Sequence, residues 1–248
     1  MNIGDPFVRH TTYCFEVLQG YMQGEFNAQG SWPSKEPAVV SEGLQERTID
    51  DLTRWKDLVK KYAAVTKMID PREMFILAMA IQRFPGPVLE IGTYRGVTTC
   101  LMTEAMNTLK RSDLIYTVEL FQEGYKGTLG DDEYPGEAYL KALKQFRGQK
   151  ALQRVVPILG DSHALHPMFW GLRPTVIFMD GDHSEEGMEM DLQMLSTLQY
   201  HWVCLIHDAS VPSVLNPVLR AREKYGFTFA NFHTGTGSEK GLTALSRL

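Results

Sequence analysis

At 248 residues, 44% of them hydrophobic, the chain is long enough for one α/β domain with a sizeable core and an additional segment. A formal charge of −5 without a dense Lys/Arg block disfavours a nucleic acid as partner, so we expect a small molecule instead. The three widely spaced cysteines and the lack of a bilayer-length apolar run favour a cytoplasmic protein without a disulfide framework or a membrane span.

Residues 1–49 show little hydrophobic periodicity. They mix Gly, Gln, Asn, Ser and Pro with isolated aromatic residues, a composition typical of a loop or an arm. The aromatic residues could cover an active site or a subunit interface, or they could anchor an irregular surface segment. Self-association as a homo-oligomer therefore stays open.

The pattern becomes helical between residues 49 and 84. Trp55, Val59 and Tyr62 lie at helical spacing and predict a first helix. Asp70 followed by Pro71 and by Glu73 predicts the start of a second helix, with a capping box between Asp70 and Glu73. We divide the chain into an N-terminal arm with a helical extension, residues 1–70, and a main domain, residues 71–248.

The segment 87–99 predicts a strand, a glycine turn and a helix. A short apolar run, residues 88–91, indicates a buried strand, and glycines follow at positions 92 and 96. Glycine at these positions lets a ligand approach the backbone. The helix expected over residues 97–109 has its N-terminus facing the turn, as in nucleotide-type sites.

The next predicted strand, residues 114–120, carries an acidic residue near its end, Glu119. Glu90, Gly92, Gly96 and Glu119 resemble the cofactor motifs of class I S-adenosylmethionine-dependent methyltransferases. The resemblance implies an α/β fold with a Rossmann-like doubly wound sheet of about seven strands and an antiparallel C-terminal strand. It also implies S-adenosylmethionine as cofactor, with its ribose on Glu119.

A long polar segment, residues 121–139, predicts a lid or a mobile connection, and it leads into a helix around residues 136–147. The third strand is expected over residues 155–161. In class I methyltransferases a polar residue at its end commonly meets the adenine, which makes Asp161 the candidate. The alternative is that Asp161 or Ser162 caps the turn that follows.

The resemblance implies one set of cofactor-contacting residues. They are Glu90, Gly92, Thr93, Tyr94, Gly96, Thr98, Glu119, Asp161, Ser162 and Asp180.

Residues 176–179 form a continuous apolar run that predicts a central parallel strand. Asp180, Asp182 and His183 follow directly, where an open α/β sheet places its ligands. Ser184 is expected to cap the next helix, whose acidic first turn needs no catalytic explanation.

The fifth predicted strand, residues 202–206, ends in His207 and Asp208. Two neighbouring strands therefore deliver Asp180 and the pair His207/Asp208 to one edge of the sheet. Oxygen ligands at this edge suit a hard divalent cation such as Mg²⁺. The alternative is that these aspartates only end strands and cap helices.

The D-G-D-H sequence and the His-Asp pair resemble the metal-dependent macrocin O-methyltransferase-like group and the related cephalosporin hydroxylase-like proteins. The resemblance implies Asp180, His207 and Asp208 as metal ligands, His183 as catalytic base and Asp180 as a second catalytic residue. His207 stands where the group has an acidic residue. It could bind through its imidazole, which shifts the preference toward softer metals, or it could leave a site of two carboxylates. The implied reaction is methyl transfer to a hydroxyl of a small sugar or natural product.

Pro212 and Pro217 predict a connection into a helix over residues 218–225. Two strands, residues 227–232 and 241–248, then predict a terminal hairpin. Three other functions stay open for the chain. They are a metal-independent methyltransferase, a hydroxylase-type enzyme and a non-catalytic cofactor-binding protein.

Overall fold

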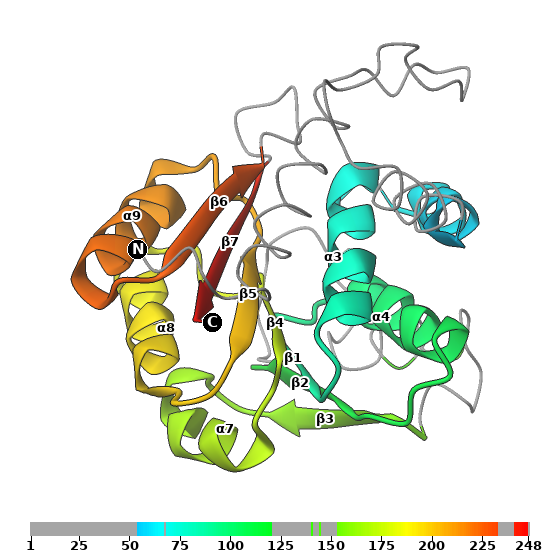
Figure 1. The fold of residues 1–248 in the computed structure, drawn as a ribbon, viewed down its shortest axis with the longest axis horizontal. Coiled ribbons are helices and arrows are strands. Elements are labelled where there is room, and N and C mark those ends of the chain that lie inside the picture. The colour runs from blue at the N-terminus through cyan, green and yellow to red at the C-terminus, as the bar shows by residue number, and fades with distance from the viewer. Residues whose placement is uncertain are drawn as a thin grey trace, which may run out of the picture.

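The structure is a computed structural model that describes residues 54–66, 68–120, 140, 144, 153–232 and 241–247. Residues 54–63 are helical, which agrees with the predicted first helix, and Trp55, Val59 and Tyr62 are buried. Figure 1 shows the elements that follow. In chain order they are α3 (Pro71–Arg83), β1 (Val88–Ile91), α4 (Val97–Thr108), β2 (Ile115–Glu119), β3 (Val155–Leu159), the 3₁₀ turn η1 (His163–Leu165), α7 (His166–Leu172), β4 (Val176–Met179), α8 (Glu185–Thr197), β5 (Trp202–Ile206), α9 (Pro212–Tyr225), β6 (Thr228–Phe232) and β7 (Leu242–Arg247).

The described strands form one seven-stranded sheet in the order β3-β2-β1-β4-β5-β7-β6. Strands β1 to β5 pair in parallel, and β7 runs antiparallel to both β5 and β6. The order reverses between β1 and β4, the point at which doubly wound folds bind ligands. The prediction of a Rossmann-like sheet with an antiparallel C-terminal strand is confirmed.

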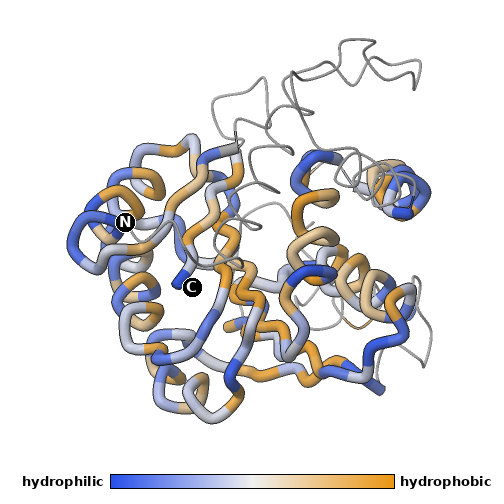
Figure 2. Tube along the Cα trace, in the orientation of Figure 1, coloured by the Kyte–Doolittle hydropathy of each residue, from blue (hydrophilic) through white to orange (hydrophobic). Residues whose placement is uncertain are grey.

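Helices cover both faces of the sheet. Helices α3 and α4 lie on one face and α7, α8 and α9 on the other (Figure 1). Along β4, Val176 and Phe178 belong to the core under α3 and α4, whereas Ile177 and Met179 belong to the core under α8 and α9. Figure 2 accordingly shows a mainly hydrophobic trace through the central strands. A strand buried on both faces explains the unbroken apolar run in the sequence.

Two of the predicted helix starts are confirmed. At α3, the Asp70 side chain accepts from the Arg72 N–H and the Glu73 side chain accepts from the Asp70 N–H, which completes the capping box. At α8, Ser184 Oγ accepts from the Gly187 N–H at 3.1 Å. Both caps fix the beginning of a helix that packs on the sheet.

The carboxyl ends of β1, β4 and β5 meet at one edge of the sheet. The Asp180 N–H donates to the Ile91 carbonyl at 2.8 Å, and the His207 N–H donates to the Met179 carbonyl at 3.0 Å. These bonds continue the strand pairing one residue beyond β4 and β5. The residues that follow the three strands are therefore held side by side.

Two predicted boundaries are wrong. Helix α9 begins at Pro212 rather than at residue 218, and Pro217 lies inside it. Pro217 removes one backbone donor, but its neighbours Val214, Val218 and Ala221 bury one face of the helix and hold the turn together. Strand β3 ends at Leu159 because Gly160, with a φ of +155°, leads the chain out of the sheet before residue 161.

Several predictions lie outside the described residues. They concern the arm at residues 1–49, the lid at 121–139, the turn at 233–240 and most of the helix expected over 136–147, of which only Leu140 and Lys144 are described, both as helical. The division at residue 70 also stays a prediction. Within the described part of the chain, no helix combines the length and the apolar character needed to cross a membrane.

Candidate active site

The glycine turn after β1 has the backbone shape that its glycines predict. Gly92 has a φ of +83° and Gly96 a φ of +70°, both in the left-handed region. A Cβ atom at Gly92 would lie 2.0 Å from the Asp180 carbonyl oxygen, so the turn is pressed against the residue that follows β4. Gly96 is the N-cap of α4, and because glycine has no side chain, the N-cap residue makes no side-chain hydrogen bond to the helix.

Glu119 holds the glycine turn in place. Its Oε2 accepts from the backbone N–H groups of Thr93 and Tyr94, each at 2.8 Å, and its Oε1 accepts from the Leu120 N–H at 3.0 Å. A carboxylate has room for about four donors, and the described residues supply three of them. Thr93, Tyr94 and Glu119 thus lie together, and Thr98 lies in the first turn of α4.

Glu90 is fully buried in β1, beneath the turn. Thr99 in α4 donates its hydroxyl to Glu90 Oε2, whereas Glu90 Oε1 has no hydrogen-bond partner among the described residues. Burial raises the pKa of Glu90 well above its ordinary value, and the charges of Asp180 and Glu119 add to this effect. Thr99 was not predicted, because its role depends on helix α4 packing over β1.

Asp161, the predicted adenine contact, and Ser162, another predicted cofactor contact, follow β3. Asp161 Oδ1 accepts from the His163 N–H at 2.9 Å, which is the capping arrangement considered as the alternative. Ser162 does not cap the turn with its side chain; its hydroxyl donates to Asp191 Oδ1 at 3.2 Å. The site thus includes Asp191 of α8, which is buried and was not predicted.

His163 links this part of the site to α8. Its Nδ1 lies 3.2 Å from Asp161 Oδ1, and its Nε2 lies 3.3 Å from Asp191 Oδ1 and 3.1 Å from the Gly187 carbonyl. The hydrogen bond to Asp191 raises the pKa of His163 to about 9, although burial opposes the shift. His163 therefore carries a positive charge near neutral pH and ties η1 to α8.

This ion pair predicts a pH-dependent stability. Because the pKa of His163 rises from 6.5 to about 9 on folding, the stabilisation is complete below pH 6.5 and is lost as the pH rises through 9. Between these pH values, we expect the free energy of unfolding to fall on the order of 2 kcal/mol more for the wild-type protein than for a His163→Gln variant. Urea unfolding at both pH values measures this difference. The same change in the free energy of unfolding for the two proteins would contradict the prediction.

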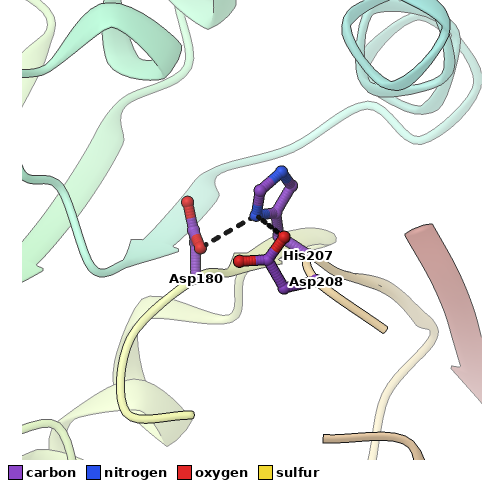
Figure 3. A group of neighbouring side chains, drawn as sticks. All are labelled: Asp180, His207 and Asp208. Atoms are coloured by element: carbon purple, nitrogen blue, oxygen red, sulfur yellow. Dashed lines mark hydrogen bonds and ion pairs between the residues drawn. The ribbon is translucent and has the colours of Figure 1, made fainter. Parts of the chain in front are cut away.

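Asp180, His207 and Asp208 form a compact cluster at the ends of β4 and β5. His207 Nδ1 lies 3.1 Å from Asp180 Oδ1 and 3.4 Å from Asp208 Oδ1. Figure 3 shows this nitrogen between the two carboxylates, while the other ring nitrogen points away from them. Burial favours a low pKa for His207, but Asp180, Asp208 and Glu73 together raise it well above its ordinary value.

His183 lies beside the same cluster but is more accessible. Its Nε2 is 3.3 Å from Asp180 Oδ1 and its Nδ1 is 3.6 Å from Asp208 Oδ2. The hydrogen bond to Asp180 raises the pKa of His183. Burial would raise the pKa of Asp180, but His207 and His183 together hold it below its ordinary value. The His183 side chain is 34% exposed, against 7% for His207.

The donor set of the cluster fits a divalent cation. Asp180, His207 and Asp208 each offer one ligand atom, and these atoms all lie within 4.8 Å of one another. Two carboxylates supply the negative charge, and two oxygens with one imidazole nitrogen are donors that divalent cations accept.

Residues 89–209, from β1 to just beyond β5, match the protein family described as a methyltransferase domain. Over these residues, just under half of its length, the chain is similar to a methyltransferase domain. No curated protein sequence matches the chain.

Solved structures of methyltransferases share the fold of this chain. The O-methyltransferase of Bacillus cereus in complex with SAH is 14% identical with a TM-score of 0.52, over 82% of this chain and 96% of that chain. The SAH-bound methyltransferase PaMTH1 of Podospora anserina is 13% identical with a TM-score of 0.54, over 85% and 98%. CalS11, a TDP-rhamnose 3'-O-methyltransferase of calicheamicin biosynthesis, is 14% identical with a TM-score of 0.52, over 97% and 94%.

Proposed function

We propose that this methyltransferase uses S-adenosylmethionine to methylate a hydroxyl group of a small sugar-type or natural-product acceptor, with the help of a divalent cation. Both solved structures quoted with SAH are methyltransferases of this fold, and CalS11, which matches nearly the whole chain, acts on a TDP-linked sugar. The sequence resemblance to macrocin O-methyltransferase-like proteins supports the same acceptor class.

One observation carries this proposal. The glycine turn and the acidic cluster are in direct contact, because the backbone of Gly92 lies against the backbone of Asp180. A cofactor on the turn and an acceptor at the cluster would therefore be neighbours, and a displacement reaction depends above all on such an arrangement.

The cofactor would be held by the turn and by the strand ends around it. Glu119 fixes the backbone of Thr93 and Tyr94, and its remaining acceptor position would bind the ribose. The N-terminus of α4, whose N-cap Gly96 has no side chain, would face the carboxylate group of the cofactor. Asp161 has one carboxylate oxygen that its bond to the His163 N–H leaves available for the adenine.

In the reaction, the methyl–sulfur bond breaks and a methyl–oxygen bond forms. A cation held by Asp180, His207 and Asp208 would lower the pKa of the acceptor hydroxyl and orient it. His183 would accept the hydroxyl proton, since it is the more exposed of the two histidines at the cluster. Its neighbours Asp180 and Asp208 would stabilise the imidazolium that results.

The test is methyl transfer from labelled S-adenosylmethionine to a panel of nucleoside-diphosphate sugars and phenols, with metal-stripped protein. We expect a hydroxyl to be methylated when Mg²⁺ or Mn²⁺ is added, and the reaction to stop with a chelator. Full activity in the chelator would contradict the role of the cation. Methylation of amines but of no hydroxyl would contradict the assignment to oxygen.

The imidazole donor also predicts a metal preference. Mg²⁺ favours sites made of oxygen atoms only, whereas Mn²⁺ binds imidazole nitrogen more readily. We expect Mn²⁺ to bind wild-type protein at least about 10-fold more tightly than Mg²⁺. In a His207→Asp variant, the ratio of the two affinities should be smaller. Calorimetric titration of each ion into both proteins measures it, and an unchanged ratio would show that His207 is not a ligand.

A further inference from the structure

Glu73 has a buried carboxylate that its helix-capping role does not explain. In a capping box, the glutamate needs only to accept the N–H of the N-cap residue, which Glu73 Oε2 does with Asp70 at 2.9 Å. Such residues lie at helix ends and are usually in contact with water. Glu73, however, is only 1% exposed, and a glutamate is almost never so buried unless it is paired.

His207 is one partner of Glu73. Glu73 Oε2 lies 3.2 Å from His207 Nε2, an ion-pair distance, although the two groups are not aligned as an ideal hydrogen bond. The same ring presents its Nδ1 to Asp180 at 3.1 Å and to Asp208 at 3.4 Å. Each nitrogen of the His207 ring therefore faces a carboxylate. The centroid of the ring lies 6.2 Å from the centroid of the Phe178 ring.

We propose that Glu73 of α3 is the positioning residue that orients His207 toward a divalent cation. Histidine ligands of metals commonly donate their second ring N–H to a carboxylate, which fixes the ring and leaves the other nitrogen to bind the ion. Glu73 lies at Nε2, so it directs Nδ1 toward Asp180 and Asp208. This inference rests on the proposed function, because it assigns a further residue to the same cation site.

The two roles of Glu73 can be separated by a pair of variants. Glu73→Gln keeps a side-chain oxygen for the capping box, in which glutamine serves as well as glutamate, but it removes the charge beside His207. Asp70→Ala removes the other half of the same capping box and leaves the contact between Glu73 and His207 in place.

The experiment is calorimetric titration of Mn²⁺ into the metal-stripped full chain, together with thermal unfolding of each protein. We expect Glu73→Gln to lower the Mn²⁺ affinity at least about 10-fold with little change in the unfolding temperature. Asp70→Ala should lower the unfolding temperature and leave the Mn²⁺ affinity within about 2-fold of wild type, because its effect is confined to the helix end.

Each of the following outcomes would overturn this inference. An unchanged Mn²⁺ affinity in Glu73→Gln would mean that Glu73 acts only as a helix cap. An equal loss of Mn²⁺ affinity in Asp70→Ala would mean that the loss comes from the disturbed helix end. If wild-type protein binds no Mn²⁺, the proposed cation site itself is wrong. Nitrogen NMR of wild-type His207 with Zn²⁺ provides a check without any variant: we expect the Nδ1 signal to shift, and a shift at Nε2 instead would also overturn the inference.

Discussion

Replacing Gly92 by alanine is expected to destabilise the protein by at least about 3 kcal/mol. The new Cβ would lie 2.0 Å from the Asp180 carbonyl oxygen and 2.4 Å from its carbonyl carbon, both backbone atoms held by the sheet. The φ of +83° adds a conformational cost for any residue with a side chain. Equilibrium unfolding in urea measures the loss.

Two other glycines provide controls that separate the steric overlap with Asp180 from the strain of a positive φ. Gly226 ends α9 with a φ of +70° but has open space around it, so Gly226→Ala should cost only about 1 kcal/mol of conformational strain. Gly171 lies in α7, and no atom of the described residues is within 4 Å of its would-be Cβ, so Gly171→Ala should stabilise the helix by about 0.5 kcal/mol. A Gly92→Ala variant no less stable than Gly226→Ala would contradict the close approach of the turn to Asp180.

The Asp180→Asn variant is expected to lower the rate of methyl transfer at least about 100-fold. The substitution keeps the size of the side chain but removes the charge that Nδ1 of His207 and Nε2 of His183 both face. Cation binding should be lost with it, since only Asp208 would then offer a carboxylate. Single-turnover methyl transfer and Mn²⁺ titration measure the two effects.

Asp182 is the matched control, two residues away in the same D-G-D-H sequence. Its exposed carboxylate accepts from the Ser184 N–H at 2.8 Å and has no contact with the cluster among the interactions of the described residues. Asp182→Asn should therefore leave methyl transfer within about 2-fold of wild type, as expected for a surface substitution away from the site. A similar loss in both variants would mean that the rate reports the stability of the loop rather than the charge at residue 180.

The parts of the fold with strong local signals could be predicted from the sequence. The apolar run at 176–179 and the polar residues after it placed β4 and the sheet edge, because a strand buried on both faces carries no alternation. The capping residues Asp70 and Ser184 marked where helices begin. Since parallel strands end at one edge, the approach of Asp180 to the pair His207/Asp208 followed from topology alone.

Contacts between distant segments could not be predicted in the same way. The local capping pattern accounted for Glu73, and nothing near it in the sequence points to His207. The bonds from Thr99 to Glu90 and from His163 to Asp191 likewise depend on how helices pack against strands. Pro217 was misleading because a proline ordinarily ends a helix, whereas here burial of the helix face outweighs the lost hydrogen bond.

Calorimetric titration of S-adenosylmethionine and then of Mn²⁺ into metal-stripped protein tests the account most directly. Wild-type protein and an Asp180→Ala, Asp208→Ala double variant should be compared. We expect the wild type to bind both the cofactor and the cation, and the double variant to bind no cation. Absence of cofactor binding to the wild type would contradict the proposed reaction. Equal cation binding by the two proteins would contradict the site at the ends of β4 and β5.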